Sequence, residues 1–252
     1  MITSLALVDP SAKKWWLFEA TPDLKEQLHM FQQITKAAYS FLPDGIFLTH
    51  GHIGHYTGLM ELGKEAMSAA AVPVFVLPRM KNYLTNNGPW SLLVQLKNIS
   101  LKELNADIPV SISSRLSVTP FLVPHRDEFT ETAGFAIQWE NKQALFIPDI
   151  DKWEKFDRKI DSLVKQSTMA FLDATFFKDG ELEGRPMAEV PHPFVTESMK
   201  QFRHLSAIDR KKIYFIHFNH TNPLLNATSS EYRQTVAGYH VATQGAVIRF
   251  PQ

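Results

Sequence analysis

Short apolar runs alternate with amphipathic segments along the chain. Apolar runs bounded by polar or proline-containing turns predict strands, whereas apolar residues spaced three and four apart predict helices. The predicted strands are residues 4–9, 14–20, 44–50, 72–78, 98–104, 116–124, 133–140, 143–150, 168–176 and 212–218. The predicted helices are residues 21–34, 55–67, 151–166 and 195–205. Thr21 is the expected N-cap of the first helix, with Pro22 at its first position. No internal repeat or linker interrupts the series, so we expect one mixed α/β (α+β) domain over residues 1–252.

The segment "VLPRMKNYLTNNGPW", residues 76–90, follows a predicted strand and is rich in amide and basic groups. We interpret it as a solvated loop, because nothing in its spacing fixes these side chains. In the alternative interpretation it borders a pocket, and Arg79 or Lys81 binds an anionic group of the substrate.

The amino-acid composition limits the kinds of molecule that the protein is expected to bind. The 252 residues are 44% hydrophobic, which supports a sizeable core, and 26 basic residues balance 26 acidic ones. This balance predicts no nucleic-acid or anionic membrane surface, so a small-molecule substrate is expected. No run approaches the roughly 18 apolar residues of a membrane span, and no secretion signal begins the chain. We therefore expect a soluble protein, with the cytoplasm favoured over export after loss of a signal. The chain has no cysteine, which excludes disulfides and thiolate ligands.

Three histidines, His50, His52 and His55, are crowded into "THGHIGH" at the end of an apolar run. A single histidine near a helix start is ordinarily satisfied by backbone and solvent. Three within six positions favour a metal site, because imidazole is the commonest metal-binding side chain and residues two apart can face one cleft.

Further candidate ligands follow other apolar runs, at the ends of predicted strands. They are His125 after "FLVP", Asp149 after "ALFIP", and His217 and His220 in "IYFIHFNH". Loops that leave a sheet edge commonly carry binding residues. His29, His204 and His240 lie within helical or mixed polar patterns, and we interpret them as ordinary surface or core residues.

The stretch "THGHIGHYTGL" resembles the H-x-H-x-D-H motif of the metallo-β-lactamase superfamily, and His125, Asp149 and His217 match its later motifs in order. The resemblance covers nearly the whole chain. Within the superfamily, "FLDATFF", "HPFVTESM" and "IYFIHFNHTNPLL" are similar to the pyrroloquinoline quinone biosynthesis protein B family, and the layout is also similar to the phosphonate-pathway cyclic phosphodiesterases. The resemblance implies a four-layer αββα sandwich with metals held by loops at one edge of the paired sheets.

The resemblance also implies two metal sites that share Asp149. The first site would be formed by His50, His52, His125 and Asp149. The second would be formed by His55, Asp149 and His217, with His220 as the alternative to His217 at the end of the same strand.

Two positions depart from the family pattern. Gly54 stands where the motif has a carboxylate, so we expect one firm metal ion and a second that binds weakly or is replaced by water. Zinc is the expected metal, with manganese or iron as alternatives. Glu19 stands where the family commonly has aspartate. It either supports the site from behind the ligands or is a solvated carboxylate at a strand end.

The resulting functional hypothesis is a metal-dependent hydrolase of phosphodiester or other ester bonds, acting through a metal-bound hydroxide. Asp149 would orient the hydroxide, and His192 would donate a proton to the leaving group. Asp173 would support the site by accepting an imidazole N–H. The alternatives are an iron-dependent oxidoreductase or hydroxylase, similar to the quinone-biosynthesis relatives, and a non-catalytic metal-binding module. Whether the protein forms a homo-oligomer stays open.

Overall fold

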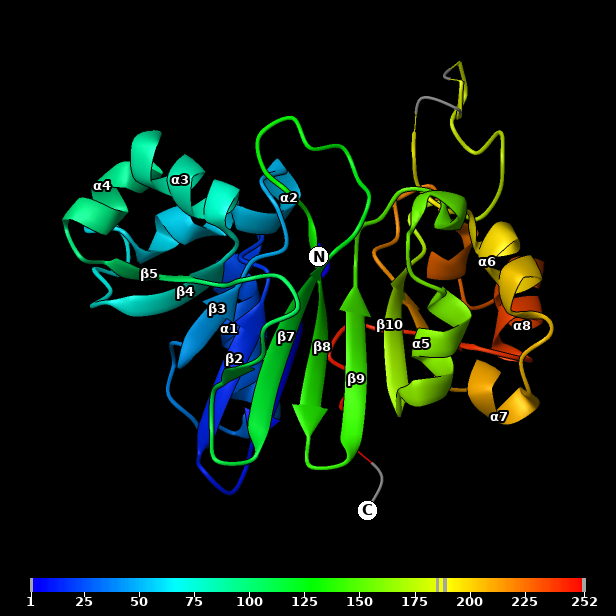
Figure 1. Cartoon of the computed structure of the whole chain (residues 1–252), viewed down its shortest axis with the longest axis horizontal. Helices are drawn as coiled ribbons and strands as arrows, with labels where there is room; N and C mark the ends of the chain where they lie inside the picture. The colour runs from blue at the N-terminus through cyan, green and yellow to red at the C-terminus, as the bar shows by residue number, and fades with distance from the viewer. Residues whose placement is uncertain (1, 185, 188–189, 251–252) are drawn as a thin grey trace. The chain divides into compact units, whose positions relative to one another are not determined.

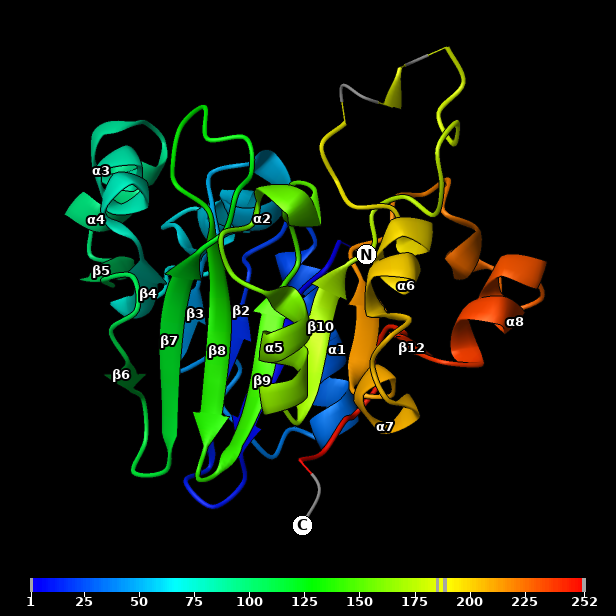
Figure 2. The ribbon, with the colours of Figure 1, turned by 45° about the vertical axis from the view of Figure 1, so that its right-hand side comes forward.

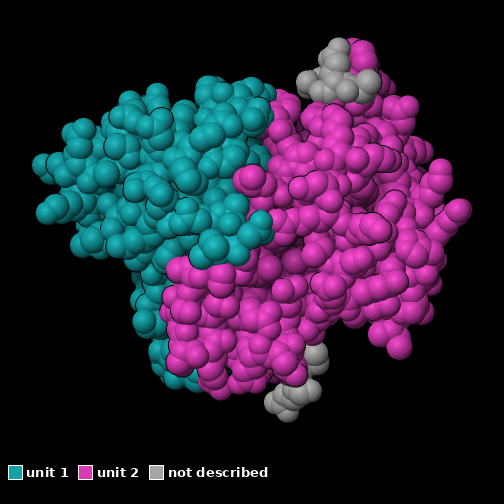
Figure 3. All heavy atoms as spheres, in the orientation of Figure 1, with its two compact units in different colours: residues 1–108, 127–133 teal, residues 109–126, 134–252 magenta. Residues whose placement is uncertain are grey.

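The structure, a computed structural model, describes residues 2–184, 186–187 and 190–250. The chain forms two compact units, coloured separately in Figure 3. The first unit comprises Met1–Ile108 and Asp127–Ala133, and the second comprises Pro109–Arg126 and Gly134–Gln252. Each unit is built around one sheet. None of the helices in the described ranges is long and apolar enough to cross a membrane.

The first unit contains a five-stranded sheet in the order β1-β2-β3-β4-β5 (Figure 1). Its strands are β1 (Leu5–Asp9), β2 (Lys14–Phe18), β3 (Gly45–Phe47), β4 (Val72–Val76) and β5 (Ile99–Glu103). The first pair is antiparallel, and the remaining pairs are parallel. Its helices are α1 (Leu24–Thr35), α2 (Ile53–Tyr56), the 3-10 helix Thr57–Leu62, α3 (Pro78–Asn86) and α4 (Trp90–Gln95).

Both faces of this first sheet are apolar. On one face, alternate strand residues such as Leu17 and Val74 pack with Leu24 and Leu28 of α1 in a buried cluster. On the other face, aromatic rings stack across the strands, and the ring of Phe47 lies 4.4 Å from that of Phe75. A sheet with two apolar faces must have both faces shielded from water, as is usual for parallel strands.

The second unit contains a seven-stranded sheet in the order β12-β11-β10-β9-β8-β7-β6. Its strands are β6 (Val110–Ser111), β7 (Leu116–Leu122), β8 (Ala133–Trp139), β9 (Lys142–Ile147), β10 (Met169–Asp173), β11 (Ile213–Ile216) and β12 (His240–Val241). Its helices are α5 (Ile160–Gln166), α6 (Val195–Phe202), α7 (Ala207–Arg210) and α8 (Ser230–Val236), with 3-10 turns at Trp153–Lys155 and Pro223–Leu225. Figure 2 shows α5 and α6 along one face of this sheet, where Val164 and Phe202 enter its core.

The topology of the second sheet gathers chemically active residues at one edge. Strands β9, β10 and β11 are parallel neighbours, so their carboxyl ends share an edge. Asp149 follows β9, Asp173 ends β10, and His217 follows β11. The register pairs Asp173 with Ile216, directly before His217.

The predicted fold class, mixed α/β with two sheets and helices, is confirmed, and every predicted strand is present. Four local predictions are wrong. Residues 151–166 form the 3-10 turn Trp153–Lys155 and the separate helix α5, which begins only at Ile160, rather than one helix. The first helix begins at Leu24 rather than after Thr21, because the backbone of Ala20 is bonded to residues 55 and 58 and keeps this turn out of the helix. Residues 55–67 form a helical turn and a 3-10 helix that ends at Leu62, rather than one long helix. Residues 78–86 form helix α3 rather than a loop.

Candidate metal centre

The three crowded histidines lie in the loop after β3 of the first unit. His50 and His55 are buried, and His52 is partly exposed. His52 has extended backbone and is the N-cap of α2, so the chain turns between His52 and His55. The turn brings the ring centroid of His50 within 4.5 Å of that of His52 and within 4.2 Å of that of His55.

Two of these rings aim nitrogens at each other. His50 Nε2 and His52 Nδ1 lie 2.8 Å apart. The opposite nitrogen of each ring is engaged elsewhere, because His50 Nδ1 lies 2.8 Å from Thr49 Oγ1 and His52 Nε2 lies 3.0 Å from Glu128 Oε2. Two convergent imidazole nitrogens, each with an outer partner on the far nitrogen, match the donor arrangement of a histidine metal site. The residues present therefore fit a divalent metal ion.

His55 is paired with the buried acid Glu19. Glu19 directly follows β2, has a left-handed backbone (φ 76°) and exposes 0% of its surface. Its Oε2 lies 3.5 Å from His55 Nδ1. Burial raises the pKa of Glu19, and the neighbouring His55 and Thr49 only partly oppose this. Glu19 is thus not a solvated strand-end carboxylate, and it faces the histidine motif.

The second unit contributes a cluster of two acids and a histidine. Asp149, Asp173 and His192 each offer a ligand atom, and these atoms lie within 4.8 Å of one another. His192 Nδ1 lies 2.8 Å from Asp173 Oδ2 and 3.1 Å from Asp149 Oδ1. The imidazole contact predicted for Asp173 is present, and its partner is His192.

Asp173 is anchored on both carboxylate oxygens. Oδ1 accepts hydrogen bonds from the Thr175 backbone N–H and hydroxyl, and Oδ2 also accepts one from the Ile150 N–H. Burial alone would lower the pKa of His192, but the charges of Asp173 and Asp149 and their hydrogen bonds outweigh it and raise that pKa to about 10.

The two remaining predicted histidine ligands of the second unit lie at the same cluster. His125 Nε2 is 3.4 Å from Asp149 Oδ1. His217, which has a left-handed backbone (φ 63°), places Nδ1 2.8 Å from Thr175 Oγ1. His220, the alternative to His217, is exposed on the following turn. The predicted ligands are thus divided, with His50, His52 and His55 in the first unit and His125, Asp149 and His217 in the second.

Gly54 occupies an open backbone position between His52 and His55. A Cβ built there would meet only Ile2 Cγ2, at 3.8 Å, and its φ lies outside the left-handed region. The backbone at Gly54 would therefore accept a side chain without strain.

Three residues of these clusters were not predicted from the sequence: Thr49, Glu128 and Thr175. Thr49 and Thr175 carried a local signal, since each lies within two residues of a predicted site residue. Glu128 carried none, because it lies 76 residues from His52 in a stretch without periodicity.

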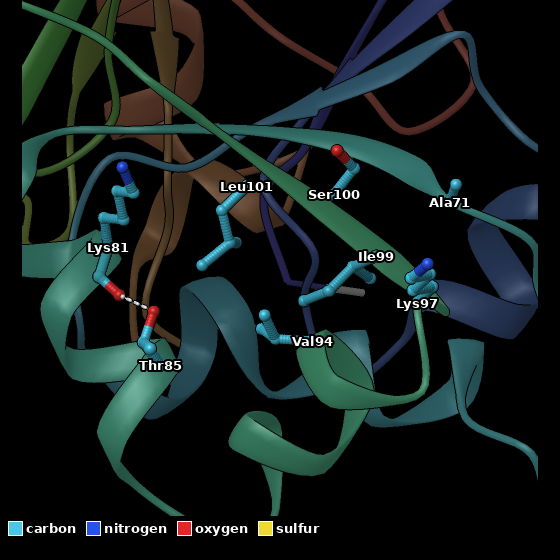
Figure 4. A pocket seen from close by; sticks show the side chains of 8 residues that line it. All are labelled: Ala71, Lys81, Thr85, Val94, Lys97, Ile99, Ser100 and Leu101. Atoms are coloured by element: carbon cyan, nitrogen blue, oxygen red, sulfur yellow. Dashed lines mark hydrogen bonds between the residues drawn. The ribbon is translucent and has the colours of Figure 1, made fainter.

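The basic residues considered for anion binding are paired within the first unit. Arg79 Nη1 lies 3.1 Å from Asp127 Oδ2, and Lys81 Nζ lies 3.1 Å from Glu103 Oε2. Lys81 also lines a hollow of about 380 Å³ between α3, α4 and β5 (Figure 4). The eight lining residues include no histidine or acid, so this hollow is separate from the histidine motif.

Residues 14–218 match the family described as Beta-lactamase superfamily domain. Coenzyme PQQ synthesis protein B from Rhizobium meliloti (strain 1021) is 25% identical over 270 residues, covering 98% of this chain and 85% of that protein.

Two solved structures share the fold. Zinc-bound PqqB from Methylobacterium extorquens has a TM-score of 0.80 at 22% identity, covering 97% of this chain and 86% of that one. A diphosphatase of the PhnP family has a TM-score of 0.64 at 20% identity, covering 94% of this chain and 81% of that one. The similarity therefore extends over almost the entire chain in both cases.

Proposed function

The chain belongs to the beta-lactamase superfamily, and from this premise we propose that it is a metal-dependent hydrolase of a phosphodiester or other ester bond in a small molecule. The observation that carries the proposal is the 2.8 Å convergence of His50 Nε2 and His52 Nδ1, with Thr49 and Glu128 engaging the far nitrogens. Two imidazole nitrogens that converge in this way, each with a partner on the far nitrogen, suit a divalent cation.

The proposed ligand set draws on both units. His50, His52, His125 and Asp149 would hold the first ion, and His55, Asp149 and His217 the second. The family match supports this assignment because it spans both groups of residues. The second site would bind more weakly, since Gly54 supplies no carboxylate. Zinc is the proposed metal because three imidazoles and one carboxylate suit it, although manganese or iron(II) could use the same donors.

A bound divalent ion would lower the pKa of a bound water and polarise a phosphoryl or carbonyl oxygen. The chain's own residues would supply orientation and proton transfer. Asp149 would accept a hydrogen bond from the attacking water. His192 Nδ1 is held by Asp173, so Nε2 is the nitrogen that would donate a proton to the leaving group. The fold relationship to a PhnP-family diphosphatase supports phosphoester chemistry.

Turnover of an activated phosphodiester tests this proposal. With zinc or manganese supplied, bis(4-nitrophenyl) phosphate should be cleaved slowly, and His192→Ala should lower kcat by about a hundredfold at unchanged metal content. His204→Ala, an exposed histidine beside α6, is the matched control and should leave kcat unchanged. Equal turnover by the wild type and His192→Ala would contradict the role of His192.

The second candidate is an iron-dependent oxidoreductase. It is favoured by the similarity, over 98% of this chain, to a coenzyme PQQ synthesis protein B. Metal analysis of protein purified without added metal separates the candidates. Zinc or manganese supports hydrolysis, and iron together with dioxygen uptake in step with product formation supports oxidation. A protein that binds metal but catalyses neither reaction would support the non-catalytic module.

A further inference from the structure

Glu128 lies behind one of the proposed metal ligands. Its Oε2 is 3.0 Å from His52 Nε2, on the opposite side of the ring from the nitrogen that faces His50. An ionised carboxylate can only accept hydrogen bonds, so a neutral His52 must carry its proton on Nε2 to satisfy this contact. The lone pair of His52 then lies on Nδ1, on the side of His50.

Thr49 contacts the far nitrogen of His50, but it does not restrict the His50 tautomer as Glu128 restricts that of His52. A hydroxyl both donates and accepts, so Thr49 can pair with His50 Nδ1 whether or not that nitrogen is protonated. With that lone pair on His52 Nδ1, His50 Nε2–H would donate to it, and His50 Nδ1 would accept from the Thr49 hydroxyl. If His50 held a cation through Nε2, it would carry its proton on Nδ1 and donate it to Thr49 Oγ1. Glu128 would thus fix the tautomer of His52, whereas Thr49 would accommodate either tautomer of His50.

The loop that carries Glu128 is fastened to the histidine motif on both sides. The Gly51 N–H donates to Thr130 Oγ1 at 2.8 Å, and the Ala133 N–H donates to the Thr49 carbonyl at 3.0 Å. The next residue before Glu128, Asp127, is paired with Arg79 of α3. These contacts, all within the first unit, hold Glu128 over His52 although the Glu128 side chain is 48% exposed.

From this geometry we propose that Glu128 is a positioning residue that fixes His52 as the Nε2–H tautomer and so aims the Nδ1 lone pair at the metal. The proposal rests on the proposed function, in which His52 is a ligand. It deepens that function by assigning a role to a residue outside the proposed ligand set. Partners of this kind typically change metal affinity by 10-fold to 100-fold. Because Glu128 is half exposed, we expect the lower end of that range.

The first test reads the tautomer in metal-free protein. Long-range proton–nitrogen correlation NMR at about pH 8, above the ordinary imidazole pKa, should show His52 protonated on Nε2 in the wild type. Glu128→Ala should give a mixture of both tautomers. Glu26→Ala, a charge-matched control at an exposed position of α1, should keep the wild-type pattern. An unchanged His52 tautomer in Glu128→Ala overturns the proposal.

The second test is zinc affinity by chelator competition. Glu128→Ala should bind zinc about tenfold more weakly than the wild type, and the control Glu26→Ala should stay within about twofold. Equal losses in the two variants would assign the effect to net charge and overturn the positioning role. Failure of the proposed function looks different, because the wild type itself would then bind no zinc while the tautomer test still reports on Glu128.

Discussion

His192 is held against Asp173 by a 2.8 Å contact between Nδ1 and Oδ2, and both side chains are buried. The same carboxylate also accepts hydrogen bonds from Ile150 and Thr175. Asp173 thus connects the end of β10 with the loop after β9 and with the segment before α6. It orients His192 and also holds this edge of the sheet together.

Asp173→Ala should therefore destabilise the metal-free protein strongly. The substitution leaves the N–H groups of Ile150 and Thr175 without their acceptor and leaves His192 with Asp149 alone. Removing one partner of a buried ion pair typically costs about 3 kcal/mol or more. Urea unfolding followed by circular dichroism would measure the loss. Asp157→Ala, an exposed acid in the same unit, should stay within about 0.5 kcal/mol of the wild type. Similar stabilities for the two variants would show that Asp173 has no such structural role.

Two glycines in the histidine motif should respond in opposite ways to alanine. A Cβ on Gly58 would overlap the backbone carbonyl oxygen of Thr21, whereas one on Gly54 has open space. Gly58→Ala should lower the free energy of unfolding by about 3 kcal/mol through overpacking. Gly54→Ala should be neutral or slightly stabilising, because alanine favours a helix more than glycine does. The midpoints of thermal unfolding compare the pair directly, and a well-tolerated Gly58→Ala would refute the close approach of Thr21.

The strands were predictable because their signals are local. The runs "ALFIP" and "AFLD" are apolar, bounded by polar residues and followed by acids, which is the pattern of buried parallel strands with functional side chains at their ends. Asp149 was identified on that basis, and Asp173 was identified in the stretch "FLDATFF", which is similar to the family. The helix at 78–86 was not, because its asparagines have low helix propensity and its stability comes from Met80 and Leu84 packing into the core.

The residues that contact the histidines from distant parts of the sequence were less predictable. Glu128 meets His52 only because residues 127–133 pack against the histidine motif within the first unit. The 3-10 helix after His55 has a similar cause, since its backbone is bonded to Ala20, 38 positions before Gly58. Such contacts depend on the tertiary fold and leave no periodic trace in the sequence.

Gly54→Asp should create a tighter second metal site. The position has no left-handed backbone and no steric obstacle, and a carboxylate adds a hard ligand that offsets the charge of a second divalent ion. Zinc titration against a chelator should show one strong step in the wild type and two in the variant, with Gly54→Ala as the control for backbone effects. Two equally strong steps in the wild type would mean that another residue already replaces the missing carboxylate.

The most direct test of the central claim, that His50 and His125 are ligands of the same proposed metal ion, is the zinc content of His50→Ala and His125→Ala after dialysis against a weak chelator. Ligands of separate sites would lose their ions independently. We expect about one tightly bound zinc per wild-type chain, near-complete loss in each single variant, no further loss in the double variant, and no loss in the exposed control His29→Ala. Full zinc content in either single variant would contradict the shared site.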